Sequence, residues 1–354
     1  MRIGVDVRPL TVPTFGIGRY TRELLDRLLK LAPHHDWYLY ADRPILEAPR
    51  SDRVAVREFP SHNRILSLAR TQLTFAHWAN RDSLDLFWSP RHHLPLFLNS
   101  GIKQLLTVHD IVWKKFPETM LPANLFVERL LMPASLARAS KVIAVSNSTK
   151  KDLVESLAID ENKIEVIYEA AGEVIVADPI REIDRDYFLF LGTSEPRKNL
   201  KRLLEGYRQY RSTGGKQALV IAGAKGWGDT SEGAWQDDGI LSLGYVSDLR
   251  LNGLLKHATA LVLPSLYEGF GLPLLEAMQR GVPVITSNIS SMPEVMGDAG
   301  IAVDPMDINS ISQALKRMGD HAERDLLASG CFDQATRFSW DTAARETLQL
   351  IESM

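Results

Sequence analysis

The sequence has little cysteine, since Cys331 is the single one among 354 residues. This excludes an internal disulfide and a cysteine-rich metal cluster, and it fits a reducing cytoplasm. The sequence also lacks an apolar run of about 20 residues, the length that a membrane-spanning helix requires. Its first residues predict a strand and a charged turn rather than a signal peptide. With 45% hydrophobic and 24% charged residues, we expect a globular, cytoplasmic protein of two domains.

An excess of positive charge is absent as well. The formal net charge of −3 gives no indication of nucleic-acid binding. The two parts of the chain differ, because residues 1–177 hold 23 basic and 20 acidic side chains, whereas the remainder holds 18 and 24. The mildly basic first part is compatible with an acidic acceptor or with an anionic membrane surface.

Short β-branched runs alternate with amphipathic helical stretches, which is typical of a doubly wound α/β sheet. The alternation starts again at Tyr187, so we expect one domain at 1–177, a second at 187–331 and a polar linker over 177–186. Apolar positions at helical spacing predict a final helix over 332–354. The expected strands are 3–7, 37–41, 54–59, 84–89, 103–108, 141–145, 163–167, 187–192, 218–223, 240–243, 260–263 and 282–286. The other expected helices are 19–31, 200–210, 249–257, 273–280 and 308–318.

The strongest functional signal is the glycine-rich segment Glu268-Gly-Phe-Gly-Leu-Pro-Leu-Leu-Glu276. It follows a predicted buried strand and begins a helix, with Pro273 at a first helical position. Gly269 and Gly271 allow the backbone to approach a ligand closely, and the N–H groups of a helix start favour a phosphate. The two carboxylates can accept hydrogen bonds from hydroxyl groups. A phosphate beside hydroxyl groups indicates a nucleotide sugar.

Two other glutamate pairs have the same spacing, Glu161 with Glu169 and Glu165 with Glu173. Neither pair is set in a turn rich in glycine and proline between a strand and a helix, and spacing alone carries no information. We therefore interpret both pairs as solvated charge.

A second cluster, Gly192-Thr-Ser-Glu-Pro-Arg-Lys-Asn199, follows the strand predicted at 187–192. Ligands of open α/β sheets bind outside this end of the strands. Arg197 and Lys198 can neutralise a diphosphate, and arginine can do so through two parallel hydrogen bonds. A solvated basic helix start is the alternative, but the glycine turn in the same domain favours a ligand site.

Gly16 and Gly18 follow the first predicted strand and supply two of the three glycines of a dinucleotide fingerprint. The third glycine is missing, which disfavours a nicotinamide cofactor. Two interpretations stay open: a turn that approaches a phosphate or sugar, and a tight connection between strand and helix.

Histidines follow two further strands. His109 can bond a sugar hydroxyl, and Asp110 can orient it or contact an acceptor. His92 and His93 are additional candidates on the acceptor side, although a lone histidine is more often structural. Two adjacent histidines need distant partners to hold a metal, and the sequence identifies none. Asp184-Arg-Asp186 lies in the expected linker before a strand, so we interpret it as solvated charge. We therefore expect no metal site.

The segment 63–81 mixes apolar side chains with Arg64, Arg70 and Arg81. An amphipathic helix that touches a membrane surface is one interpretation. Ordinary packing of these apolar side chains in a core is the other.

Together these motifs resemble those of glycosyltransferase family 4, the retaining glycosyltransferases of GT-B architecture. The resemblance covers nearly the whole chain and includes Glu268–Met278, 192–199, His109-Asp110, the Gly16 and Gly18 turn and Gly244-Tyr-Val-Ser-Asp248. It implies two Rossmann-like doubly wound domains that face a cleft. The acceptor-binding domain would be 1–177 and the nucleotide-sugar-binding domain 187–331, with the helix 332–354 crossing back to the first. The group is similar to bacterial mannosyl- and rhamnosyltransferases that build O-antigen or other surface polysaccharides.

The resemblance also implies roles for residues. Glu276 would hold the ribose hydroxyls, and Glu268 would contact the donor sugar near its 3-hydroxyl. Arg197 and Lys198 would bind the diphosphate, and His109 would contact the donor sugar from the first domain. Thr193 stands where many relatives carry an arginine, which leaves more of the diphosphate charge to Arg197. The other residues expected around the donor are Gly16, Gly18, Tyr245, Val246, Gly269, Phe270, Gly271 and Leu272, with the base near Tyr245 and Val246.

The implied reaction retains the anomeric configuration and uses neither a metal nor a cofactor besides the nucleotide sugar. The leaving diphosphate helps to deprotonate the acceptor hydroxyl on the same face, through an oxocarbenium-like state. A double displacement would need a carboxylate beneath the anomeric carbon, and the sequence identifies none. The expected donor is a GDP sugar, mannose before rhamnose. The expected acceptor is a glycan or a polyprenyl-diphosphate-linked glycan, reached by peripheral contact with the inner membrane face.

Other functions stay open on the sequence alone. A sugar-nucleotide epimerase of the same architecture would interconvert a nucleotide sugar without an acceptor. A non-catalytic subunit would bind the nucleotide sugar without hydrolysing it. A dehydrogenase would give a nicotinamide absorbance signal, and the incomplete fingerprint disfavours it.

Overall fold

The structure is a computed structural model that describes residues 1–12, 16–49, 51–59, 64–172, 181–224, 226 and 239–354, with only the backbone of 64–69. The chain forms two compact units. Unit 1 comprises Met1–Glu169 and Ser339–Met354, and unit 2 comprises Ala170–Phe338. The expected linker 177–186 lies partly outside the described residues, and so do Thr14 and Phe15 before the first glycine turn.

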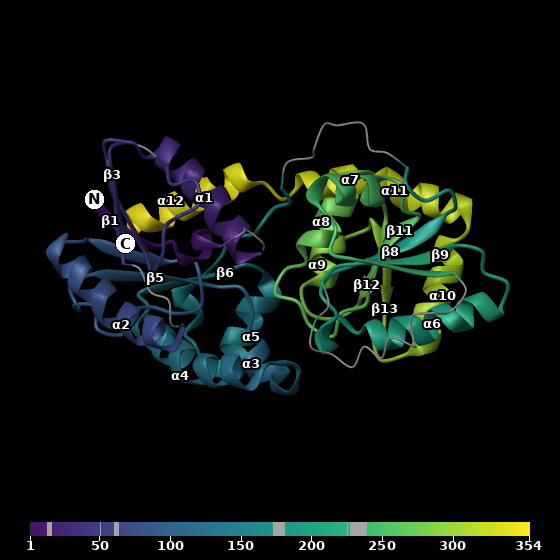
Figure 1. Cartoon of the computed structure of the whole chain (residues 1–354), viewed down its shortest axis with the longest axis horizontal. Helices are drawn as coiled ribbons and strands as arrows, with labels where there is room; N and C mark the ends of the chain where they lie inside the picture. Colours follow the sequence, from purple (N-terminus) through teal and green to yellow (C-terminus); the bar gives the residue numbers. More distant parts are fainter. Residues whose placement is uncertain (13–15, 50, 60–63, 173–180, 225, 227–238) are drawn as a thin grey trace. The chain divides into compact units, whose positions relative to one another are not determined.

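Unit 1 is built on a parallel sheet of seven strands in the order β3-β2-β1-β4-β5-β6-β7 (Figure 1). Side chains of β1 and β4 are buried on both faces, because helices cover both sides of a parallel sheet. The strand order reverses between β1 and β4, which are hydrogen-bonded neighbours. The strands are β1 Arg2–Asp6, β2 Asp36–Ala41, β3 Val54–Glu58, β4 Leu86–Ser89, β5 Lys103–Val108, β6 Lys141–Ala144 and β7 Ile164–Val166.

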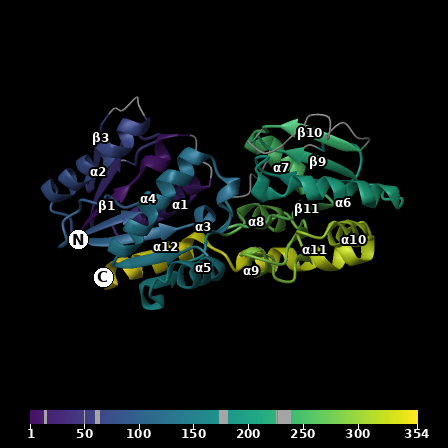
Figure 2. The same ribbon diagram turned by 90° about the horizontal axis from the view of Figure 1, so that it is seen from below.

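The helices of unit 1 cover opposite faces of this sheet. Along the strand order of the sheet, the connection from β1 to β2 runs toward the β3 edge. The connections from β3 to β4, β5 to β6 and β6 to β7 run toward the β7 edge. Because such crossovers are right-handed, α1 lies on one face, and α2, α4 and α5 lie on the other (Figures 1 and 2). The helices are α1 Ile17–Leu31, α2 Arg64–Arg81, α3 Val112–Lys115, α4 Pro122–Arg138, α5 Asn147–Leu157 and α12 Trp340–Ser353, with short 3-10 turns at Arg8–Thr11, Pro117–Thr119 and Glu161–Lys163.

The C-terminal helix α12 packs on α1, so both ends of the chain contribute to unit 1 (Figure 1). The rings of Tyr20 and Trp340 meet edge to face with centroids 5.9 Å apart. Arg27 Nε donates to Asp341 Oδ1 at 2.7 Å at the start of α12. The prediction of one helix over 332–354 is wrong, because α11 of unit 2 ends at Thr336 and Ser339 is extended before α12 begins.

Unit 2 is built on a second parallel sheet, with six strands in the order β10-β9-β8-β11-β12-β13. The strand order reverses here between β8 and β11. The strands are β8 Tyr187–Leu191, β9 Ala218–Ala222, β10 Ile240–Gly244, β11 Ala260–Leu263, β12 Val284–Ser287 and β13 Gly300–Val303. The helices are α6 Leu200–Ser212, α7 Asp248–Lys256, α8 Leu272–Met278, α9 Met292–Met296, α10 Ile308–Met318 and α11 His321–Thr336, and the short 3-10 turn is Pro196–Lys198.

The fold therefore confirms two doubly wound α/β units and a C-terminal helix that returns to the first. Each unit has a strand-order reversal, and ligands of such sheets bind outside the carboxyl ends of the strands at that point. None of the helices in the described ranges is both long enough and apolar enough to cross a bilayer.

Replacing Ile351 with alanine tests the docking of α12. Ile351 is fully buried in unit 1, so the cavity should lower the free energy of unfolding by about 2–4 kcal/mol. Thermal unfolding of the full chain measures the effect. The matched control is Gln349→Ala, because Gln349 is exposed on the same helix, and it should change stability by less than about 0.5 kcal/mol. Equal melting temperatures for the two variants would contradict this packing.

Candidate functional site

The loops that follow β8 and β11 meet at the strand-order reversal of unit 2. Leu266 N donates to Arg197 O at 2.8 Å, which joins the two loops through their backbones. The buried side chain of Asn199 adds two bonds, from Nδ2 to Pro264 O at 2.9 Å and to Pro305 O at 2.7 Å. Asn199 has a left-handed backbone, with φ of 60°, a conformation that asparagine tolerates well. The two predicted motifs are thus parts of one structure.

Glu268 is the centre of this structure. Its Oε1 atom accepts from Lys198 Nζ at 2.6 Å and from Ser265 Oγ at 2.8 Å. Its Oε2 atom accepts from Arg197 Nη1 at 2.6 Å. The residue is only 8% exposed, so these are charge-assisted bonds with little competition from water.

The pKa of Glu268 shows which effect dominates in this site. Burial by itself would raise the pKa of this carboxyl group. The positive charges of Arg197 and Lys198 outweigh burial and lower the pKa to about 2. Glu268 is therefore a carboxylate at neutral pH, and it can accept hydrogen bonds but not donate them.

The two cations around Glu268 differ in how firmly they are held. Arg197 also donates to Tyr267 O at 2.7 Å and to Glu195 Oε2 at 3.3 Å. Thr193 Oγ1 donates to the other oxygen of Glu195 at 2.8 Å, which fixes that carboxylate. Among the described residues, the ammonium group of Lys198 hydrogen-bonds only Glu268. Lys198 is thus the cation that can turn toward an anionic ligand at the smallest cost in existing bonds.

The glycine turn between Glu268 and α8 is supported from the next loop. Ser291 Oγ donates to Glu268 O at 2.9 Å and to Phe270 O at 2.7 Å. Gly271 has a φ of 113° and caps α8, so a residue with a side chain would be strained there. A Cβ atom at this position would also lie 3.2 Å from Met292 Sδ. The turn therefore depends on glycine and on the loop before α9.

The remaining residues predicted in unit 2 lie around this core. Glu276 is half-buried on α8, and its backbone oxygen accepts from Arg280 Nη1 at 2.6 Å. Leu272 begins α8, and Phe270 is buried with its ring 5.5 Å from Phe338. Tyr245 and Val246 follow the edge strand β10, which β9 separates from β8. These residues thus lie in the loops at the carboxyl ends of the strands of unit 2 or in helix α8 that follows one of them.

In unit 1, His109 lies at the carboxyl end of β5 as predicted, in a buried network. Its Nδ1 atom is 2.7 Å from Glu169 Oε1, and its Nε2 atom is 3.0 Å from Pro90 O. Both ring nitrogens thus face oxygen acceptors, and the ring can donate to both only as the imidazolium cation. The ring of Tyr20 packs edge-on against it at 4.7 Å.

Glu169 corrects the interpretation of the other two glutamate pairs. Glu161 and Glu165 are exposed, as expected for solvated charge, and Glu173 lies outside the described residues. Glu169 is buried and bonded to His109, so the interpretation is wrong for this residue. Its role depends on the adjacency of β5, β6 and β7, which residue spacing does not reveal.

His92 and His93 share one carboxylate. Glu128 Oε2 lies 3.1 Å from His93 Nε2 and 3.5 Å from His92 Nδ1. Burial lowers the pKa of His93. Burial also acts to lower the pKa of His92. At His92, however, the hydrogen bond and the negative charge of Glu128 outweigh burial and raise the pKa. His92 Nε2 accepts from His109 N at 3.2 Å, which connects this cluster to the His109 network.

The other predicted residues of unit 1 have local structural functions in the fold. Asp110 Oδ1 accepts from the backbone N–H of Val112, the first residue of α3, at 3.1 Å. Gly16 caps α1 with a φ of 49°, and no atom lies within 4 Å of where its Cβ would be. Glycine is therefore favoured at position 16 by the positive φ of the backbone, and not because a side chain would clash with its neighbours. Gly18 is buried within α1.

A buried charge cluster at the reversal point of unit 1 is not among the predicted residues. Arg8 Nε donates to Asp6 Oδ1 at 2.9 Å just after β1. Burial, and then the charge of Arg8, lower the pKa of Arg91, which follows β4. The charged turn after the first strand is the signal in the sequence that indicates this cluster.

Comparisons with known proteins agree with this geometry. Residues 177–325 match the family described as Glycosyl transferases group 1, and residues 15–170 match Glycosyltransferase Family 4. The chain is 31% identical to the O-antigen chain mannosyltransferase B of Escherichia coli over 98% of both chains. It is 30% identical to the O-antigen chain mannosyltransferase RfbU of Salmonella typhimurium over 66% of this chain and 64% of that protein.

Solved structures share the fold at lower identity. A sucrose-phosphate synthase from Thermosynechococcus elongatus superimposes with a TM-score of 0.77 at 18% identity, covering 99% of this chain and 98% of that one. WaaG, a glycosyltransferase involved in lipopolysaccharide biosynthesis, superimposes with a TM-score of 0.75 at 15% identity, covering 99% of both chains. These likenesses support the architecture of two doubly wound units.

The Glu268 cluster predicts a pH-dependent contribution to stability. Glu268→Gln leaves Arg197 and Lys198 near a neutral amide, and it should cost roughly 3 kcal/mol at pH 7. The pKa of Glu268 is about 2 in the folded state, against an ordinary value of 4.5. Its stabilisation is therefore present above pH 4.5 and is lost as the pH falls from 4.5 toward 2. The difference in melting temperature between wild type and variant should shrink over that range.

The matched control for this prediction is Asp333→Asn, because Asp333 is an exposed carboxylate in the same unit. This variant should melt close to wild type at every pH. A constant difference between wild type and Glu268→Gln from pH 7 to pH 3 would show that the charge of Glu268 does not stabilise unit 2.

Proposed function

The chain belongs to glycosyltransferase family 4, and from this membership we propose that it transfers mannose from a nucleotide sugar to a glycan of the O-antigen class. Enzymes of this family retain the anomeric configuration and use a nucleotide-sugar donor without a metal. Mannose and O-antigen are proposed because two relatives at 30% identity or more carry these words in their names.

The observation that carries the proposal is the Glu268 cluster at the reversal point of unit 2. A nucleotide sugar presents a diphosphate and sugar hydroxyls within a few ångströms of each other. Lys198 supplies a mobile positive charge for the diphosphate, and Glu268 supplies oxygens that accept from hydroxyls. The half-buried Glu276 on α8 is proposed to hold the ribose, and Tyr245 and Val246 to lie near the base.

Binding of the donor would rearrange the bonds of Lys198. In the structure, Lys198 Nζ is bonded to Glu268 Oε1 at 2.6 Å. A diphosphate carries more charge than a carboxylate and would attract this ammonium group, while a sugar hydroxyl replaces it at Glu268. As the bond to the sugar breaks, charge grows on the leaving diphosphate. A cation at that position stabilises the transition state more than the ground state.

Unit 1 is proposed to supply the acceptor side, with Asp110, His92 and His93 as candidates. His109 is proposed to contact the donor sugar. For this contact, its Nε2 atom would exchange Pro90 O for a hydroxyl, while Glu169 keeps Nδ1 in place. The predicted assignment of the acceptor to the first domain and of the nucleotide sugar to the second remains part of the proposal.

A GDP sugar is proposed as the donor, and a glycan on a polyprenyl diphosphate carrier as the acceptor. Such a carrier lies in a membrane, so we propose a cytoplasmic enzyme that works in peripheral contact with the inner membrane face. The charge of residues 1–177, 23 basic against 20 acidic side chains, is compatible with that location.

Lys198→Ala should lower kcat by about 100- to 1,000-fold, because it removes charge stabilisation from the leaving group. The KM for the donor should change much less. The assay follows transfer from GDP-mannose to a lipid-linked acceptor, with nucleotide release as a second readout. Lys201→Ala is the matched control, because Lys201 is exposed in the first turn of the adjacent helix α6, and it should keep wild-type turnover. Wild-type turnover in Lys198→Ala would remove Lys198 from the mechanism.

Binding of nucleoside diphosphates tests the donor site separately from catalysis. GDP should raise the melting temperature more than UDP, dTDP or ADP, since a ligand at 100 times its dissociation constant stabilises by about 2.7 kcal/mol. The increase should disappear in Glu276→Ala. A larger shift with another nucleotide would correct the base alone, whereas no shift with any of the four would contradict the donor site.

A further inference from the structure

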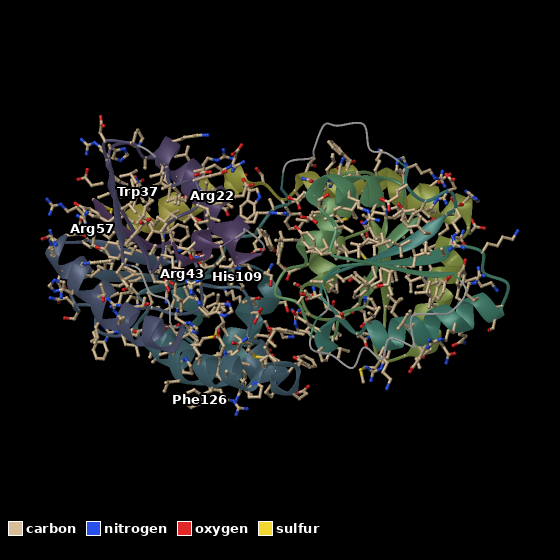
Figure 3. All side chains as sticks on the ribbon, viewed as in Figure 1. Arg22, Trp37, Arg43, Arg57, His109 and Phe126 are labelled. Carbon is tan, nitrogen blue, oxygen red and sulfur yellow. The ribbon has the colours of Figure 1, made fainter. Side chains whose placement is uncertain are left out.

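Helix α4 of unit 1 exposes large apolar side chains along one side. Phe126 is 68% exposed and Leu130 is 59% exposed, and their spacing of four places them on the same face of the helix. Figure 3 shows Phe126 on the outer side of α4, away from the sheet. The opposite side of the helix packs inward through Leu131, Met132 and Leu136, all buried. An apolar side of this kind marks an interaction surface.

The apolar surface continues to α2 through the loop 94–98. Leu94 N donates to Ser135 Oγ of α4 at 2.9 Å, and Leu96 N donates to Gln72 Oε1 of α2 at 2.7 Å. Phe97 of this loop is 63% exposed, and Leu73 of α2 is 61% exposed. Both helices lie on the same side of the sheet in Figures 1 and 2.

We call this surface the α2–α4 face. It consists of Leu73, Phe97, Leu121, Phe126 and Leu130 with Arg70, Arg81, Arg129 and Arg138.

The exposed charged side chains of α2 and α4 are arginines among the described residues. Helix α2 contains no aspartate or glutamate, and its exposed residues include Arg70 and Arg81. Helix α4 contains a single acidic residue, Glu128, whose carboxylate is bonded to His92 and His93. Arg129 and Arg138 of α4 are exposed. Apolar side chains among arginines are the composition of a helix that lies in the interface of an anionic bilayer.

We propose that the α2–α4 face docks unit 1 on an anionic lipid surface, with Phe126 and Leu130 inserted among the acyl chains. This inference rests on the proposed function, which places the acceptor on a lipid carrier. The arginines would lie at the level of the lipid phosphates, where each basic side chain contributes attraction that salt weakens. Because the contact uses a few side chains and no spanning helix, it is reversible.

A second copy of the chain fits this face less well. A two-fold symmetric dimer places the same surface of each subunit against the other. The arginines of one copy would then face those of its partner, and like charges across an interface oppose association. The charge pattern therefore favours a negatively charged partner.

Vesicle binding tests the proposal with the full chain. Wild type should sediment with vesicles of phosphatidylcholine and phosphatidylglycerol, and much less with phosphatidylcholine alone or in high salt. The double variant Phe126→Ser/Leu130→Ser should bind the anionic vesicles at least about tenfold more weakly, because it removes the inserted apolar groups. Arg81→Glu/Arg129→Glu should weaken binding and reduce its dependence on salt.

The matched control is Leu326→Ser/Phe332→Ser on α11 of unit 2. These residues are also exposed, at 74% and 62%, and their loss should leave vesicle binding unchanged. Equal binding by wild type and Phe126→Ser/Leu130→Ser would overturn the proposal. So would a dimer in sedimentation velocity that this variant converts to a monomer, since the face would then belong to a second copy.

The melting shift with GDP, measured without vesicles, separates this inference from the proposed function. A chain that shifts with GDP but does not bind anionic vesicles keeps its donor site and refutes the docking surface. A chain that binds anionic vesicles through the α2–α4 face but responds to no nucleoside diphosphate supports the surface and contradicts the donor site.

Discussion

The carboxylate of Glu268 is the group on which the ligand-facing edge of unit 2 depends. It joins the loop after β11 to the loop after β8, because Lys198 and Arg197 both bond to it. Without this negative charge, two partly buried cations would repel each other in a region with little water. The arrangement also fits the proposed reaction. Arg197 keeps its bonds to Tyr267 and Glu195, while Lys198 has a carboxylate partner that a diphosphate can replace.

The same topological rule operates in both units. In a parallel sheet whose strand order reverses, the loops that follow the two strands at the reversal run in opposite directions. The space between these loops, outside the carboxyl ends of the two strands, accepts a ligand. In unit 2 these loops carry Lys198 and Glu268. In unit 1, Asp6 at the end of β1 pairs with Arg8 in the loop that follows, and the loop after β4 carries His92 and His93. The chemistry differs between the units because the loop residues differ, whereas the scaffold that positions them is the same.

Much of this architecture can be predicted from the sequence, because buried parallel strands appear as short apolar runs. The expected strand 103–108 coincides with β5, whereas the less apolar β13 was not predicted, since its four residues include Gly300 and Ala302. Helix α4 has no clear polar side, so periodicity does not reveal it. The residues around Glu268 can be predicted as ligand contacts, but their mutual pairing depends on β8 lying next to β11. Glu169 shows the limit most clearly, because its burial follows from strand order and not from local sequence.

The position of α12 has a consequence for synthesis of the protein. The side chains of α1 that face α12, including Tyr20, emerge from the ribosome more than 300 residues before Trp340 does. Throughout translation the first sheet must therefore persist with one helix surface uncovered, or be shielded by a chaperone. Synthesis of α12, rather than completion of the first sheet, is the step that covers this surface of α1.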